Sequence, residues 1–131
     1  YKRKRIHITM TSIAKTVDSI SSASIMKELP ACPVERTLLL MGDKWKILII
    51  RDLLDGSMRF GELKKSVGSI SQKVLTTNLR TMEANGLVQR KIYAEVPPKV
   101  EYSLTPLGRS LQSVLDAMES WGEHYHGERN G

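Results

Sequence analysis

The sequence contains few residues of the kinds that crosslink a chain or anchor a β-sandwich: one cysteine, one phenylalanine and two tryptophans in 131 residues. The single cysteine, Cys32, excludes an internal disulfide framework and is typical of the reducing cytoplasm, where we expect the protein to act. No run of about 20 apolar residues is present, so we predict no membrane-spanning helix and no membrane partner. The shortage of aromatic residues favours a single domain of helices packed through aliphatic side chains.

The sequence also lacks the common catalytic motifs, because it contains no HExxH, no GxSxG, no P-loop and no Gly-rich dinucleotide turn. His124 and His126 are two residues apart, so they do not share one face of a helix. We therefore expect no catalytic residue, no metal site and no cofactor, and we predict that the protein is not an enzyme.

Positive charge is concentrated in one part of the chain. The formal net charge is +6, and residues 2–5 supply four of these charges. Residues 57–93 contain seven basic and two acidic side chains, whereas residues 106–131 contain two basic and four acidic ones. A localised basic segment is the electrostatic footprint of a protein that binds a polyanion, although a solvated basic face would have the same composition.

We expect three parts along the chain. Residues 1–31 form an N-terminal arm, either a flexible extension or a remnant of expression cloning, because they show little sustained periodicity. Residues 32–126 form the folded domain, and residues 127–131 form a short tail.

The first half of the domain is predicted to contain three helices. Pro33 suits the first turn of a helix that continues to Met41 and ends at Gly42. Asp43 is placed to cap a second helix, Lys44 to about Leu54, which is apolar nearly all round and should lie at the centre of the core. A third helix is expected over residues 60–67.

The fourth predicted helix has two distinct faces. Ser71 suits its N-cap, with Ser69 and Gln72 as an alternative capping box, and Asn85-Gly86 ends it. One stripe is apolar and should be buried. The opposite stripe consists of side-chain types that hydrogen-bond base edges in the major groove: Gln72, Lys73, Thr76, Thr77 and Arg80.

Two strand-like runs follow, Leu87–Tyr93 and Val100–Leu104, joined by a proline-containing loop that suits a projecting hairpin. Apolar residues then repeat at helical spacing through one long C-terminal helix. This stripe is longer than a small domain needs to cover its core, so we predict that it is a homodimer interface. Its residues are Leu107, Leu111, Val114, Leu115, Met118, Trp121 and Tyr125.

Helices, a polar-faced helix and a hairpin in this order predict a winged helix-turn-helix that binds double-stranded DNA: a mainly α fold with a small β-hairpin and an added C-terminal dimerisation helix. The polar stripe of the fourth helix should read bases. Five other residues should contact phosphates: Arg59, Lys64, Lys65, Ser71 and Lys99. The alternative is a winged-helix adaptor that mediates protein contacts without DNA, because each of these features alone is often only a solvated surface.

From Cys32 to about Tyr125 the chain resembles the HxlR-type family of bacterial transcriptional regulators. The resemblance is carried by short stretches in one order: Cys32-Pro33-Val34, Gly42-Asp43-Lys44-Trp45, Arg59-Phe60-Gly61-Glu62-Leu63, Ile70-Ser71-Gln72-Lys73-Val74-Leu75-Thr76, Leu79 with Glu83, Gly86-Leu87-Val88, Arg90, Val100 to Gly108 and Trp121. It implies a dimeric winged-helix repressor or activator.

The resemblance also implies a role for Cys32, because several members of that family use a cysteine just before the first helix to sense oxidants or electrophiles. The residues themselves favour this interpretation in part, since free N–H groups and the dipole at a helix start stabilise a thiolate. A lone cysteine is otherwise often a small buried apolar residue. The second cysteine that some members pair with it is missing. A small oxidant or electrophile is thus the expected effector.

Overall fold

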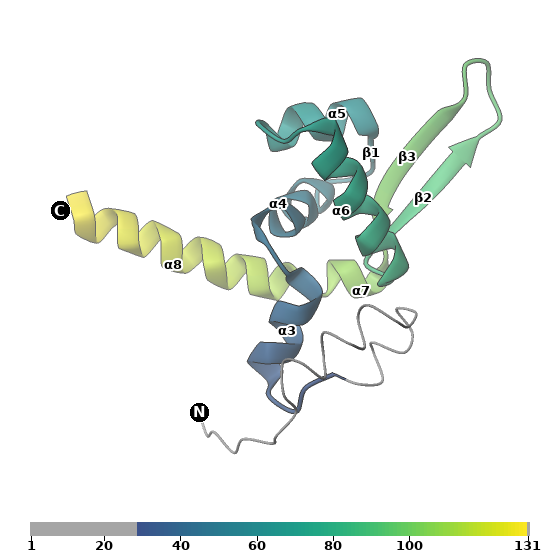
Figure 1. Ribbon diagram of the computed structural model, residues 1–131. Coiled ribbons are helices and arrows are strands. Elements are labelled where there is room, and N and C mark those ends of the chain that lie inside the picture. The colour runs from purple at the N-terminus through teal and green to yellow at the C-terminus, as the bar shows by residue number, and fades with distance from the viewer. Residues whose placement is uncertain (1–28, 131) are drawn as a thin grey trace.

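The computed structural model describes residues 29–130, with side chains as far as Tyr125 (Figure 1). Most of the predicted arm lies outside the described residues. The elements in chain order are α3 (Pro33–Met41), α4 (Lys44–Leu53), β1 (Met58–Arg59), α5 (Phe60–Val67), α6 (Gln72–Ala84), β2 (Val88–Tyr93), β3 (Lys99–Leu104), α7 (Pro106–Arg109) and α8 (Gln112–Asn130). The mainly helical fold with a small sheet is the one that the sequence predicts.

The helix boundaries follow local chemistry. Pro33 occupies the first turn of α3, where its missing N–H removes no helical hydrogen bond, and Gly42 ends the helix with a φ of 65°. The Asp43 side chain then caps α4, because its Oδ1 accepts a hydrogen bond of 3.1 Å from the backbone N–H of Lys46. These boundaries confirm the predicted first and second helices to within one residue.

The core surrounds α4. Ile49, Ile50 and Leu53 have no exposed surface, and α4 contacts both α5 and α6. The buried apolar set completes the core at the sheet and the neighbouring helices: Met41, Leu63, Val67, Ile70, Leu75, Leu79, Met82, Leu87, Val88 and Leu104. This arrangement supports the predicted central role of the second helix.

The sheet has three antiparallel strands in the order β1-β3-β2. The predicted hairpin is β2 paired with β3, and Val88 lies opposite Leu104 at its buried end. Strand β1 was not predicted, because two residues are too short to show an alternating pattern. Met58 and Arg59 form a strand only because they pair with Tyr102 and Glu101 at the outer edge of β3.

The C-terminal region differs from the single long helix expected from the sequence. It contains the short α7 and the long α8, joined at Ser110 and Leu111. The junction uses tighter turns, since the N–H groups of Ser110 and Leu111 bond to the carbonyls three residues earlier, those of Leu107 and Gly108. The repeat of apolar residues continues through this junction, so periodicity could not reveal it.

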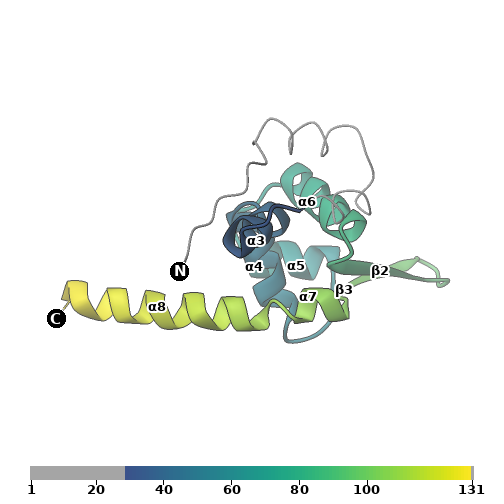
Figure 2. The ribbon, with the colours of Figure 1, turned by 90° about the horizontal axis from the view of Figure 1, so that it is seen from below.

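Helix α7 is held against the sheet at Gly108. A Cβ at this position would collide with the backbone carbonyl oxygen of Leu87. Thr105 caps α7 by accepting a bond of 3.0 Å from the N–H of Gly108, and its hydroxyl donates to the carbonyl of Gly86. From this anchored start, α8 extends away from the body on the side opposite the β2–β3 hairpin, as both views show (Figures 1 and 2). The helix continues through residues 127–130, which were expected to be a tail.

Candidate nucleic-acid interface

Helix α6 is the central element of the candidate interface. Ser71 is its N-cap, and its Oγ accepts a hydrogen bond of 3.1 Å from the N–H of Val74, as the sequence predicts. Leu75, Leu79 and Met82 on the inner face are buried in the core. Burial of one face against α4 therefore determines which face of α6 is presented to solvent.

The outer face of α6 carries the five residues that the sequence proposes for base readout. Gln72, Lys73, Thr77 and Arg80 are exposed, and Thr76 is half-buried. No hydrogen bond or ion pair joins the side chains of Gln72, Lys73 or Arg80 to another residue of the described region. The structure thus brings all five onto one helix, with polar groups that remain available to a ligand.

A buried carboxylate connects α4, on which α6 packs, to α5. Asp52 of α4 is only 8% exposed, and it accepts a hydrogen bond of 2.9 Å from Ser66 Oγ of α5. Arg51 Nε donates to the same carboxylate at 2.7 Å, and this bond raises the pKa of the Arg51 guanidinium. The sequence alone does not reveal this link, because nothing in the local pattern shows that residues 52 and 66 meet.

The predicted phosphate-binding residues fall into two groups. Lys64 and Lys65 lie in the last turn of α5, and Ser71 lies just before α6, so these three flank the turn between the two helices. Arg59 and Lys99 lie instead on the sheet, Arg59 at the end of β1 and Lys99 at the start of β3. The structure therefore divides the five between the turn and the sheet.

Lys99 lies at the start of β3, next to the loop that joins the two strands of the hairpin, and its side chain has partners within the chain. Its Nζ is 3.3 Å from Glu101 Oε2 and 4.9 Å from the ring centroid of Tyr93. Burial raises the pKa of Glu101, but hydrogen bonds from Tyr93 and Lys99 and the charges of Lys99 and Arg59 outweigh it, so that the pKa is lowered overall. Lys99 is thus already paired within the chain.

The exposed apolar surface is on α8 and α3. Of the predicted dimer residues, Leu111, Val114 and Leu115 pack against the core of the same chain. The others remain exposed on α7 and α8: Leu107, Met118, Trp121 and Tyr125. The rings of Trp121 and Tyr125 stack with centroids 5.3 Å apart, and Val34 and Leu38 of α3 are also exposed. The predicted stripe therefore has a part that covers its own core and a part that does not.

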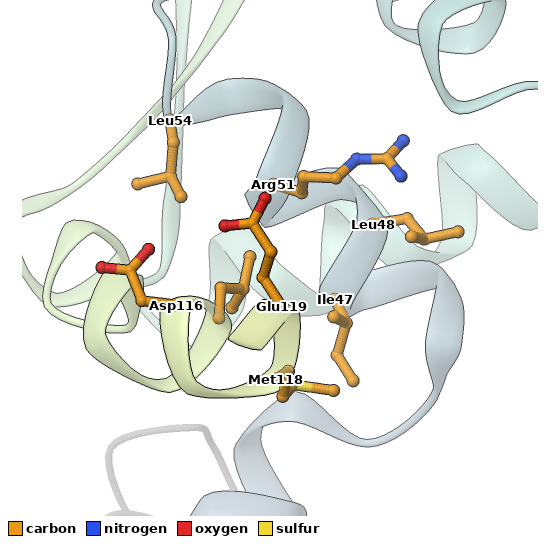
Figure 3. A pocket seen from close by; sticks show the side chains of 8 residues that line it. Ile47, Leu48, Arg51, Leu54, Asp116, Met118 and Glu119 are labelled. Atoms are coloured by element: carbon orange, nitrogen blue, oxygen red, sulfur yellow. The ribbon is translucent and has the colours of Figure 1, made fainter. Parts of the chain in front are cut away.

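Two shallow apolar pockets flank Met118. One, of about 350 Å³, lies between α4 and α8 and is lined by Ile47, Leu48, Arg51, Leu54, Leu115, Asp116, Met118 and Glu119 (Figure 3). The other, of about 340 Å³, lies between α3, α4 and α8. In Figure 3 the guanidinium of Arg51 points away from the carboxylates of Asp116 and Glu119. Apolar side chains consequently form most of the surface between α4 and α8.

Cys32 is the N-cap residue of α3 and is half-exposed. Its carbonyl oxygen accepts a bond of 3.0 Å from the N–H of Arg36, and the guanidinium of Arg36 donates to the carbonyl of Ala31 at 2.9 Å. A cation therefore lies beside the backbone that carries the thiol, in agreement with the expected helix-start position.

Among the described residues, no group of three or more histidine, cysteine or acidic side chains is placed to hold a metal ion. The side chain of His126, one of the two histidines considered for a metal site, lies outside the described residues. Of the helices in the region the structure describes, none has the length and apolar character needed to cross a membrane.

The helices α4, α5 and α6, followed by the β2–β3 hairpin, define a winged helix-turn-helix regulator (Figure 1). The chain belongs to the HxlR-like helix-turn-helix family, whose profile matches residues 40–130. This confirms the family that the sequence motifs indicate.

Known relatives agree with this assignment. YdeP of Bacillus subtilis (strain 168), an HTH-type transcriptional regulator, is 47% identical over 98 residues, which cover 75% of this chain and 77% of YdeP. The reduced form of the redox regulator HypR is 46% identical with a TM-score of 0.69, and covers 72% of this chain and 94% of its own. The reduced transcriptional regulator YodB from B. subtilis is 39% identical with a TM-score of 0.63, over 72% of this chain and 94% of its own. The protein is thus a transcriptional regulator by family.

Proposed function

We propose that this regulator binds duplex DNA sequence-specifically by inserting α6 into the major groove. The observation that carries the proposal is the outer face of α6, where five polar or basic side chains are exposed or half-buried on a capped helix whose inner face is buried in the core. Major-groove base edges are read by residues of these types, and a helix fits the groove. The family assignment supports this role.

The proposed contacts have two kinds of energetic effect. Gln72, Lys73, Thr76, Thr77 and Arg80 would read bases, whereas Arg59, Lys64, Lys65 and Ser71 would bind phosphates, which position the protein without specifying sequence. Selection of bound duplexes from a random DNA pool tests the proposal directly. Enrichment of one motif supports it, whereas a pool that stays random at all salt concentrations contradicts it and favours a protein-binding adaptor.

We further propose a homodimer formed through α8 and α3. Exposed Met118, Trp121 and Tyr125 on α8 and Val34 and Leu38 on α3 form an apolar surface of the kind that marks an interface. A two-fold axis there would place two α6 helices about 34 Å apart and require a near-palindromic operator. Sedimentation equilibrium would contradict the dimer if the chain stayed monomeric at micromolar concentration while binding one half-site with full affinity.

Cys32 is proposed as the point of regulation by an oxidant or electrophile. Its half-exposed position at the start of α3 supports this, as does the likeness to HypR, which is described as a redox regulator. Oxidation or alkylation of the thiol would displace α3, which contributes to the proposed dimer surface. A change of about 1.4 kcal/mol in the balance between two states alters affinity tenfold. The test is DNA affinity before and after quinone, aldehyde or peroxide treatment, with Cys32→Ser as the unreactive control. Equal affinity in all samples would contradict it.

A further inference from the structure

One face of the sheet carries a cluster of charged side chains that the base-reading helix does not include. Glu101 of β3 lies directly opposite Arg59 of β1 and directly opposite Lys91 of β2. Tyr93 lies opposite Lys99 one step further along the hairpin. Directly opposed residues share a face of an antiparallel sheet, and so do alternate residues of one strand. The five side chains therefore share one face, while Val88 and Leu104 occupy the face that enters the core.

Glu101 is the centre of this cluster. Its Oε1 accepts a hydrogen bond of 3.1 Å from the Tyr93 hydroxyl, and its Oε2 is 3.3 Å from Lys99 Nζ. The side chains of Lys99 and Glu101 are only 27% and 24% exposed. Glu101 therefore fixes both the ring of Tyr93 and the ammonium of Lys99 against the sheet.

Lys91, unlike Lys99, forms no ion pair with Glu101. It is exposed, and its Nζ lies 5.0 Å from the centroid of the Tyr93 ring. Within the described region it forms no ion pair with a carboxylate. The Tyr93 ring, which Glu101 holds in place, thus lies beside the Lys91 ammonium, and no carboxylate of the cluster forms an ion pair with that ammonium.

We propose that Lys91, rather than Lys99, is the hairpin cation that binds a phosphate of duplex DNA, and that Glu101 is the positioning residue that holds Tyr93 beneath Lys91 and keeps Lys99 paired. This inference rests on the proposed function and assigns roles to Lys91, Tyr93 and Glu101 that the charge pattern did not. Lys99 must lose its ion pair with Glu101 before it can neutralise a phosphate, whereas Lys91 has no such ion pair to lose.

The salt dependence of binding distinguishes the two lysines. Each phosphate neutralised by the protein adds about 0.9 to the slope of log affinity against log salt, because condensed counterions are released. The experiment measures affinity for one duplex, by fluorescence anisotropy of the full chain, over a range of salt concentrations. Lys91→Ala should lower the slope by about 0.9, and Lys91→Arg should restore it. Lys99→Ala should leave the slope unchanged.

The Glu101→Gln substitution should change the salt slope in the opposite direction to Lys91→Ala. The amide keeps an oxygen that can accept from Tyr93 but removes the charge that pairs Lys99, so the slope should rise by up to about 0.9. Adding Lys99→Ala to Glu101→Gln should cancel that rise. Thermal unfolding of each variant verifies that the fold is intact, and a merely structural role for Glu101 would not raise the slope.

The experiment distinguishes failure of the Lys91 assignment from failure of the proposed DNA binding. If the unaltered protein shows a steep slope but Lys91→Ala does not reduce it, or if Lys99→Ala reduces it equally, the assignment of Lys91 is overturned while DNA binding stands. A flat slope for the unaltered protein overturns both the assignment and the proposed function.

Discussion

Helices α6 and α8 each leave one face uncovered, but the chemistry of the two faces is opposite. The outer face of α6 presents Gln72, Lys73 and Arg80, whereas α8 presents Met118 and Trp121. The polar groups of α6 form hydrogen bonds with water in the free protein and can exchange them for hydrogen bonds with base edges, so their exposure costs little free energy. Apolar groups in the second case gain free energy only when they leave water. This difference is the basis for proposing that α6 binds nucleic acid and that α8 binds another protein surface.

The largest expected effect comes from placing a charge on the apolar face. Met118→Glu should prevent dimer formation, because an unpaired carboxylate buried at an interface costs about 3–5 kcal/mol. Sedimentation should show a monomer, and affinity for a two-half-site operator should fall by about 100-fold or more. Met118 is 47% exposed in the single chain, so the substituted monomer should still fold and unfold cooperatively, although it loses the stabilisation that the dimer supplies. Met118→Leu is the matched control, and a dimer that survived the glutamate would place the interface elsewhere.

On the polar face, the expected effect is on sequence preference. Gln72→Ala or Thr76→Ala should reduce discrimination between the preferred operator and a single-base variant by about 1–3 kcal/mol. Lys65→Ala should instead weaken binding to all sequences equally, since a phosphate contact has no sequence information. Competition binding with matched duplexes measures both. Unchanged preference after alanine substitution at every position of the face would show that α6 does not read bases.

Ser71 belongs to both the fold and the interface, and two substitutions separate these roles. Ser71→Ala removes the hydroxyl that caps α6 and should lower the free energy of unfolding by about 1 kcal/mol, measured by urea denaturation. Ser71→Asp preserves a good cap but adds a negative charge where a phosphate is proposed. It should therefore keep the stability and weaken DNA binding. If the aspartate variant bound DNA as tightly as the original, Ser71 would not lie near a phosphate.

The smallest expected effect is the acid dependence of the hairpin. The pKa of Glu101 is lower in the folded chain, so its charged form stabilises the fold at pH values above the unfolded pKa of about 4.3. That contribution is lost as pH falls from there through the folded pKa. The melting temperature of Glu101→Gln should therefore vary less with pH below about 5 than that of the original protein. Parallel melting curves for the two proteins over this range would contradict the role of Glu101.

Local chemistry made much of the fold predictable. Pro33, Gly42, Asp43 and Ser71 act within one turn of their own position, so the helix boundaries they set can be inferred from neighbouring residues alone. The polar stripe of α6 was predictable for the same reason, because a helical period determines which residues share a face.

Other features depended on contacts between distant residues. Strand β1 exists because β3 offers a free edge, and α7 lies against the backbone of Leu87 because Gly108 has no side chain. The pairing of Lys99 with Glu101 and Tyr93 is likewise a matter of strand register. The sequence shows that Lys91 and Tyr93 alternate along β2 and so share a face. It does not show that Lys91 lies opposite Glu101 and Tyr93 opposite Lys99.

The sequence by itself therefore determined the order of helices α3 to α6 and of the hairpin, most of their boundaries and the polar face of α6, because these follow from hydrogen bonds and periodicity within a few residues. Only the tertiary structure decided which part of the C-terminal apolar stripe covers the protein's own core and which cations of the hairpin remain free. Burial and ion pairing depend on which distant residues meet, and chain spacing alone does not specify those encounters.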